Sequence, residues 1–150
     1  MAELGVPPRA LTVEITESSV MADPSRTIGV LSRLSALGVS IAIDDFGTGY
    51  SSLSYLKRLP VDEIKIDRSF VAGMMVDDND AVIVRSTIEL ARSLGLRVVA
   101  EGVEDHATWS RLAELGCDLA QGFYLSPPVA AAELAALLRA EEVTRDALGG

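Results

Sequence analysis

The chain has 150 residues, of which 49% are hydrophobic, and this size and composition suit one globular domain. Thirteen basic residues against 22 acidic ones give a formal net charge of −9, which argues against a nucleic acid or an anionic membrane as the partner. No apolar run approaches the ~20 residues that span a bilayer, and residues 1–10 lack the pattern of a signal peptide. The single cysteine, Cys117, allows no disulfide within the chain, which fits a reducing cytoplasmic compartment.

Strand and helix patterns alternate along the chain. Five stretches are predicted strands: 11–16, 40–44, 63–67, 97–102 and 119–124. Helices are predicted at about residues 24–37, 53–59, 79–94, 106–115 and 130–140, and residues 141–150 are predicted to form a frayed tail. Three of the helices end in Leu-Gly shortly before a strand. The sequence therefore repeats a β-α unit, which is typical of a parallel sheet.

Local signals indicate where the helices begin and which faces they bury. Asp78 or Asn79 is expected to cap the longest helix, and Asp105 to cap the next one. Trp109 and Leu112 are expected on the buried face of that next helix.

The predicted strands share one pattern: one face is apolar throughout, and the other becomes polar toward the carboxyl end. Because side chains alternate faces along a strand, these polar positions fall on one face of the sheet. In chain order they are Glu14, Asp44, Lys65, Glu101 and Gln121. An open sheet covered by helices on both faces needs apolar residues on both, whereas a barrel gathers its site at the carboxyl ends of its strands. The sequence therefore predicts an α/β fold of the TIM-like (β/α) barrel type.

Carboxylates dominate the predicted cluster. Asp45 directly follows Asp44, so four carboxylates and one lysine would meet there without a histidine or thiolate. Hard oxygen ligands favour Mg²⁺ or Mn²⁺ over a structural zinc. Four carboxylates exceed what one Mg²⁺ normally takes, and two ions ~3.5–4 Å apart would relieve their repulsion and support in-line displacement at phosphorus. Lys65 is then suited to orient the attacking water or to stabilise developing negative charge.

The same residues allow a different chemistry. A lone lysine at the end of a barrel strand can be a Schiff-base nucleophile, which would make the chain an aldolase-like lyase without a metal. The surrounding carboxylates count against this alternative, because they raise the pKa of the lysine.

Four long stretches resemble the EAL domain family of bacterial cyclic di-GMP phosphodiesterases: VEITES, IAIDDFGTGYSSLSYLKRLPVDEIKIDRSFV, VVAEGVE and QGFYLSPP. The resemblance covers about residues 1–138, with the right order and spacing. It implies a TIM-like barrel with two Mg²⁺ or Mn²⁺ ions that hydrolyses one phosphodiester of cyclic di-GMP to give linear pGpG, in bacterial signal transduction. The alternative function is a non-catalytic cyclic di-GMP receptor or scaffold.

The resemblance also implies roles for individual residues. Those that match metal ligands are Glu14, Asp44, Asp45 and Glu101. Those that match groups around the attacking water are Lys65, Glu101 and Gln121. Glu101 matches either a ligand or the general base. Those that match supporting residues are Glu17, which would steady the loop after the aspartates, Asp67 and Glu104.

The resemblance begins part-way through the family pattern. The Glu-Ala-Leu segment and the asparagine strand that precede Glu14 in the family have no counterpart in the chain. The chain is therefore expected to form about the last five β-α units, with residues 1–140 as a truncated domain. Alone it is expected to be a weak or inactive hydrolase, and its two unpaired sheet edges should favour association. By the same resemblance, a homodimer contact is expected through the loop region at 46–56.

Overall fold

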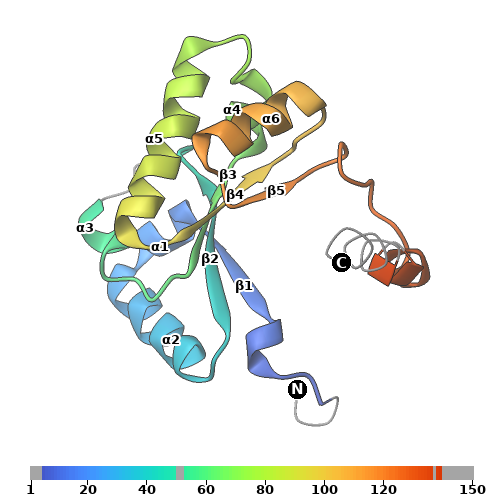
Figure 1. Ribbon diagram of the computed structural model, residues 1–150. Helices are drawn as coiled ribbons and strands as arrows, with labels where there is room; N and C mark the ends of the chain where they lie inside the picture. Colours follow the sequence, from blue (N-terminus) through green and yellow to red (C-terminus); the bar gives the residue numbers. More distant parts are fainter. Residues whose placement is uncertain (1–4, 50–52, 137, 140–150) are drawn as a thin grey trace.

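The computed structural model describes residues 5–49, 53–136 and 138–139. These residues contain one parallel sheet with the strand order β1-β2-β3-β4-β5 (Figure 1). The strands are β1 Thr12–Thr16, β2 Ser40–Phe46, β3 Glu63–Ile66, β4 Arg97–Glu101 and β5 Leu119–Gln121. The helices are α1 Glu17–Ala22, α2 Pro24–Ala36, α3 Leu53–Leu56, α4 Arg68–Gly73, α5 Asp78–Leu94 and α6 His106–Leu115, with a 3-10 helix, η2, at Pro8–Ala10.

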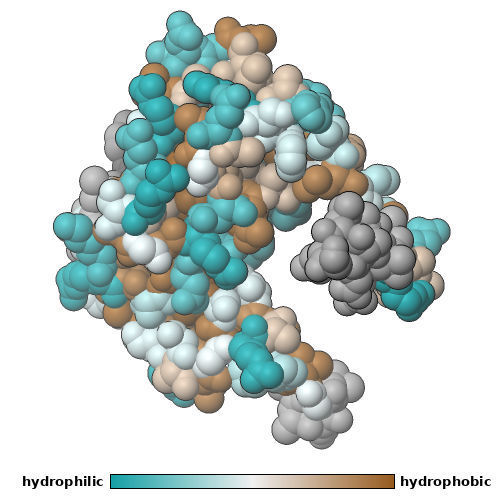
Figure 2. All heavy atoms as spheres, in the orientation of Figure 1, coloured by the Kyte–Doolittle hydropathy of each residue, from teal (hydrophilic) through white to brown (hydrophobic). Residues whose placement is uncertain are grey.

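The strand order confirms a fold built from consecutive β-α units. Each strand pairs in parallel with the strand that follows it along the chain. In Figure 1, α2 and α5 lie on the same side of the twisted sheet. Figure 2 shows that the molecule is hollowed on its right side, between the segment leading into β1 and the end of β5. Helices outside and strand ends inside are the arrangement of a (β/α) barrel, of which the described residues form five units.

The hydrophobic core lies between the sheet and the helices that cover it. Its fully buried members include Ile41, Ile64, Ile66 and Val98 from the strands and Val71, Val84, Ile88 and Leu112 from the helices. Burying one such side chain contributes about 1.5–3 kcal/mol relative to leaving it exposed. The apolar strand face predicted from the sequence is therefore the face that holds the helices.

Strand β2 is longer than predicted. It was expected to end at Asp44 but continues to Phe46, which is buried. The pairing of β2 with β3 shifts register between Ile43 and Phe46, and Asp45 has a φ of 53°. A bulge of this kind adds a residue to one strand and re-aims the side chains beside it. Both aspartates therefore belong to a bulged strand rather than to its end.

Two short helices were not predicted. Helix α1 directly follows β1, and α4 directly follows β3. Each has six residues, which is too short for a helical hydrophobic period to be recognised. Asp67, expected at the end of a strand, is the N-cap of α4, and its Oδ1 accepts a hydrogen bond from Ser69 N at 2.9 Å.

Other details of the prediction need correction. The cap of α5 is Asp77, whose Oδ1 accepts a hydrogen bond from Asn79 N at 2.7 Å, rather than either of the two residues expected. Trp109 is 40% exposed and lies outside the core. Strand β5 ends at Gln121 because the chain turns there, with Leu125 N donating to the carbonyl of Gly122. The cap at Asp105 is confirmed.

β1 and β5 are the outer strands, and each pairs with a single strand among the described residues. Residues 131–136 are helical, within the helix predicted at 130–140, while the predicted tail at 141–150 lies outside the described residues. Among the helices described, none has the length and apolarity needed to cross a bilayer. The division of the chain at residue 140 stays a prediction.

Candidate active site at the carboxyl ends of the strands

Four charged side chains meet at the carboxyl ends of neighbouring strands. The side chain of Lys65, on β3, is only 7% exposed. Its Nζ lies 2.7 Å from Glu14 Oε1 and 2.6 Å from Glu101 Oε1. Asp44 Oδ1 lies 3.4 Å from the same Nζ. These four residues, here called the Lys65 cluster, come from β1, β2, β3 and β4, so the structure brings them together as the alternation of side chains predicts.

The strand register staggers the members of this group: Glu14 pairs with Ala42, two residues before Asp44, and Lys65 pairs with Val99, two residues before Glu101. Thr16 of β1 pairs with Asp44 of β2, and Glu101 of β4 pairs with Gln121 of β5. Because all five strands run in the same direction, their carboxyl ends meet at one edge of the sheet. Residues far apart in the sequence are therefore brought near one another by backbone pairing, and the long side chains of Glu14, Lys65 and Glu101 make the contacts.

The pKa of Lys65 is held above its ordinary value. Burial by itself lowers this pKa, but hydrogen bonds with Glu101 and Glu14 and the charge of Asp44 outweigh it. The side chain is therefore an ammonium group at neutral pH. A protonated amine is not a nucleophile, which disfavours the Schiff-base lyase.

Asp45 and Asp67 lie beside the cluster and interact with each other. Burial raises the pKa of Asp45, and the negative charges of Asp44, Asp67 and Glu101 raise it further. Burial also acts to raise the pKa of Asp67, but hydrogen bonds from Ser69 and Asp45 lower it below its ordinary value. The aspartate pair is thus a place where negative charge accumulates.

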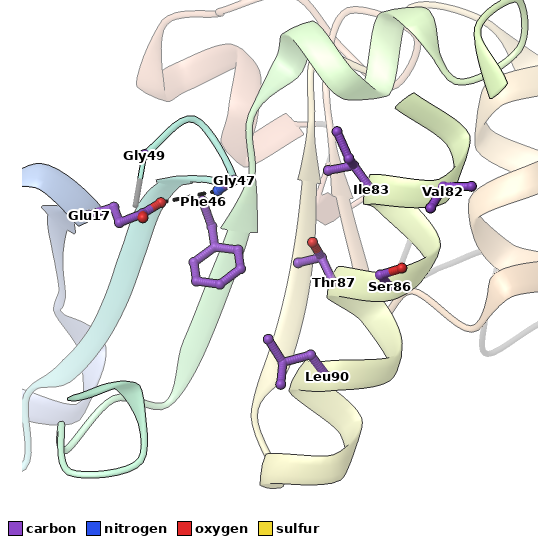
Figure 3. A pocket seen from close by; sticks show the side chains of 9 residues that line it. All are labelled: Glu17, Phe46, Gly47, Gly49, Val82, Ile83, Ser86, Thr87 and Leu90. Carbon is purple, nitrogen blue, oxygen red and sulfur yellow. Dashed lines mark hydrogen bonds between the residues drawn. The ribbon is translucent and has the colours of Figure 1, made fainter. Parts of the chain in front are cut away.

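Glu17 lies against the loop that follows β2. It is 3% exposed, and its Oε2 accepts a hydrogen bond from Gly47 N at 3.2 Å (Figure 3). Gly47 has a φ of 101°, a conformation that favours glycine over any other residue. The contact has the geometry expected of a residue that steadies this loop.

A cavity of about 250 Å³ lies beside the cluster. Glu101, Glu104 and Gln121 line it, and the last two are exposed. Sequence reasoning missed two further lining residues, Arg68 and Phe123. A guanidinium group suits an anionic ligand such as a phosphate. The sequence did carry a signal for Arg68: it directly follows a predicted strand, at the edge of the sheet where the polar residues gather.

The donor chemistry of the site fits divalent cations. The described residues do not present three Asp, Glu, His or Cys side chains already arranged around an ion. However, Asp44 Oδ1 is buried and accepts no hydrogen bond from the described residues, since the approach of Lys65 is an ion pair only. Burial and neighbouring carboxylates also raise the pKa of Asp45, which marks a deficit of positive charge. Carboxylate oxygens are preferred by Mg²⁺ and Mn²⁺, and Glu14 and Glu101 would join by turning away from the lysine.

Fold and site together define a TIM-like α/β barrel protein with a carboxylate-rich site at the strand ends. The chain belongs to the EAL domain family, whose model matches residues 1–128. It is 51% identical over 129 residues to the bifunctional diguanylate cyclase/cyclic di-GMP phosphodiesterase MucR of Pseudomonas aeruginosa. It is 48% identical over 130 residues to the cyclic di-GMP phosphodiesterase NbdA of the same organism. These matches cover 86% and 87% of the chain but only 19% and 17% of the two relatives.

Solved structures give the same result for the fold. A MucR phosphodiesterase in complex with cyclic di-GMP matches with a TM-score of 0.86 and 49% identity, over 89% of this chain and 54% of that one. A manganese/cyclic di-GMP complex of Klebsiella pneumoniae BlrP1 matches with a TM-score of 0.76 and 38% identity, over 82% of this chain and 31% of that one. The predicted TIM-like fold is thereby confirmed.

Proposed function

We propose that the chain carries the site of a metal-dependent cyclic di-GMP phosphodiesterase that forms linear pGpG. The observation that carries the proposal is the Lys65 cluster at the carboxyl ends of the strands, in a member of the EAL domain family. The names of MucR and NbdA and the cyclic di-GMP in the MucR complex support the choice of substrate.

Four acids at the strand ends would hold two Mg²⁺ or Mn²⁺ ions. These acids are Glu14, Asp44, Asp45 and Glu101. When bound, the ions would supply Lewis acidity and charge neutralisation at the phosphodiester. The buried Asp44 Oδ1 without a hydrogen bond supports this assignment, as does the manganese in the BlrP1 complex.

The chain's own groups would do the remaining work. Lys65 offers a fixed positive charge that stabilises negative charge developing on the phosphodiester oxygens. Glu101 would be a metal ligand or the general base that takes the proton of the attacking water. Gln121, its neighbour across β4 and β5, would orient that water through its amide. Supporting roles fall to Glu17, Asp67 and Glu104.

The test is hydrolysis of cyclic di-GMP by the 150-residue chain, with linear pGpG measured by chromatography. We expect slow turnover with Mg²⁺ or Mn²⁺ and none with EDTA. Turnover should be lower with Ca²⁺, because its larger radius and looser geometry suit in-line chemistry less. Asp44→Asn should abolish turnover, whereas Asp118→Asn, at the opposite edge of the sheet, should keep it. Turnover in EDTA, or an active Asp44→Asn variant, would contradict the proposal.

A non-catalytic receptor or scaffold is the second candidate. It is favoured by one observation: Lys65 already pairs with Glu14 and Glu101, so the cluster holds together without a metal. Binding of cyclic di-GMP that EDTA does not change, with no pGpG formed, would support the receptor over the enzyme.

The loop region at 46–56 is also proposed as a homodimer contact. Its support is the resemblance together with the exposure of residues 47–49; residues 50–52 lie outside the described part of the chain. Sedimentation analysis of the chain and of a Thr48→Arg variant would test it. Unchanged association in that variant would count against this contact.

A further inference from the structure

A cavity of about 350 Å³ lies between the loop that follows β2 and helix α5 (Figure 3). Phe46 lines it on the loop side, and Figure 3 shows Ile83, Thr87 and Leu90 of α5 pointing toward that side. Ser86 and Thr87 add hydroxyl groups and Glu17 a carboxyl group to a lining that otherwise consists of apolar residues and glycines. A concave, mostly apolar space of this size with a few polar groups is typical of small-molecule sites.

Glu17 also lines this cavity and has unused hydrogen-bonding capacity. It is 3% exposed, and its Oε2 accepts a hydrogen bond from Gly47 N. Its Oε1 is buried, and none of the described residues donates a hydrogen bond to it. Among the described residues, no Lys, Arg or His side chain forms an ion pair with this carboxyl. A buried carboxylate oxygen without a partner is costly, so Oε1 is an acceptor for a donor that the described residues do not supply.

The loop beside the cavity connects Glu17 to the candidate active site. A Cβ added at Gly49 would lie 3.0 Å from Glu17 Oε1, so the backbone of Gly49 covers the unused oxygen closely. A Cβ at Gly47 would lie 3.6 Å from Ile83 Cγ2 on α5. The loop leaves β2 immediately after the bulge at Asp45. A group that reaches Oε1 therefore touches the loop and fixes its position between the aspartates and α5.

We propose that this cavity binds a small amphipathic cation: an apolar ring or short chain that carries one protonated amine or amidine. The apolar part would pack between Phe46 and Leu90. The N–H group would donate to Glu17 Oε1 once the backbone of Gly49, which covers that oxygen, moves outward, and its positive charge would compensate the buried carboxylate. The same carboxylate disfavours an anion. The site lies outside the Lys65 cluster, so binding there does not depend on hydrolysis, and occupancy would act on the aspartates through the loop.

Benzamidine is a suitable probe because its phenyl ring and amidinium group match the two halves of the site. We expect the 150-residue chain to bind it saturably in a calorimetric or NMR titration, with chemical-shift changes in the loop at 46–49 and in α5. Benzoate, an anion of the same shape, should bind at least about tenfold more weakly, since one lost charge-assisted hydrogen bond amounts to roughly that factor.

Matched variants distinguish binding of benzamidine in the cavity from nonspecific attraction of a cation to an acidic protein. Glu17→Gln removes the buried charge and should weaken benzamidine binding about tenfold. Glu89→Gln removes an exposed charge from α5 outside the cavity and should leave binding unchanged. Because a change at a buried residue can also affect folding, Ser86→Phe gives a second route: Ser86 is exposed and lines the cavity, so the new ring should fill it and abolish binding. Ser93→Phe, on the same helix outside the cavity, should bind normally.

Three results would overturn the proposal. The first is equal binding of benzamidine and benzoate, or binding of neither. The second is unchanged benzamidine binding in both Glu17→Gln and Ser86→Phe. The third is probe binding that disappears as the protein concentration rises, which would assign the cavity to a second copy of the chain.

Discussion

The two edges of the sheet both carry acids, but they use them differently. At the amino-terminal edge the acids have structural partners. Asp62 Oδ2 accepts a hydrogen bond from Ile41 N at 2.9 Å, which ties the start of β2 to the turn before β3. Asp118 Oδ2 accepts the equivalent bond from Val98 N at 2.8 Å, two strands further along the sheet. The repeated β-α unit thus repeats the hydrogen bond that joins the start of one strand to the turn before the next strand.

At the carboxyl edge the acids outnumber their partners. Glu14, Asp44 and Glu101 all approach Lys65, and no residue in the described part of the chain donates a hydrogen bond to Asp44 Oδ1. Burial and neighbouring carboxylates raise the pKa of Asp45. The difference shows that acids at one edge hold the fold together, whereas acids at the other leave a charge deficit that a bound cation would remove.

The largest effect should come from removing the cation of the carboxyl edge. Lys65→Met leaves three carboxylates without their shared partner and should lower the free energy of unfolding by about 3–5 kcal/mol, the usual cost of breaking a buried ion pair. Arg97→Met breaks the pair of a 56% exposed side chain with Glu63 at the other edge, and should cost less than about 1 kcal/mol. Urea denaturation measures both. Equal costs would remove the distinction between the edges.

Metal addition should reveal the charge deficit directly. Mn²⁺ at about 100 times its dissociation constant should stabilise the chain by about 2.7 kcal/mol, since it binds only the folded state. Asp44→Asn should lose this response and Asp118→Asn should keep it. Thermal unfolding with Mn²⁺ and with EDTA is the measurement. A response that both variants lose, or that neither loses, would place the metal elsewhere.

In metal-free protein, removing an acid from the amino-terminal edge should cost more stability than removing one from the carboxyl edge. Asp118→Ala removes the acceptor for the backbone N–H of Val98 and should cost about 1–2 kcal/mol. Asp44→Ala removes a carboxylate whose Oδ1 accepts no hydrogen bond within residues 5–49, 53–136 and 138–139, and should cost less than about 0.5 kcal/mol. Urea denaturation in EDTA tests this order. A greater loss in Asp44→Ala would mean that its pairing with Lys65 is structural.

The smallest effect concerns Asp45 and pH. Its pKa is raised in the folded state above the ordinary value of 3.8, so its ionisation opposes folding at neutral pH. Asp45→Asn should therefore stabilise metal-free protein at pH 7 by a few tenths of a kcal/mol, because solvent screens the charges. The gain should shrink as pH falls through the folded-state pKa toward 3.8. Denaturation curves across pH 4–7 would show it, and a gain that grows on acidification would contradict the sign.

Much of this arrangement follows from local sequence patterns. Strand alternation predicts that Glu14, Asp44, Lys65 and Glu101 share one edge, because the side-chain period of a strand is fixed by its backbone. The Leu-Gly helix ends are equally local, and Gly95 and Gly116 indeed adopt left-handed conformations. The short helix α4 was missed because six residues carry too little periodic signal.

The sequence by itself determined the order of the elements, the apolar face of the sheet and the edge at which the acids gather. All three depend on backbone periodicities that act over a few residues. Only the tertiary structure decided which acids share Lys65, that β2 bulges at Asp45, and that Glu17 keeps an unused oxygen beside α5. These features depend on side chains that lie far apart in the sequence and meet through strand register and packing, and no local pattern encodes such contacts.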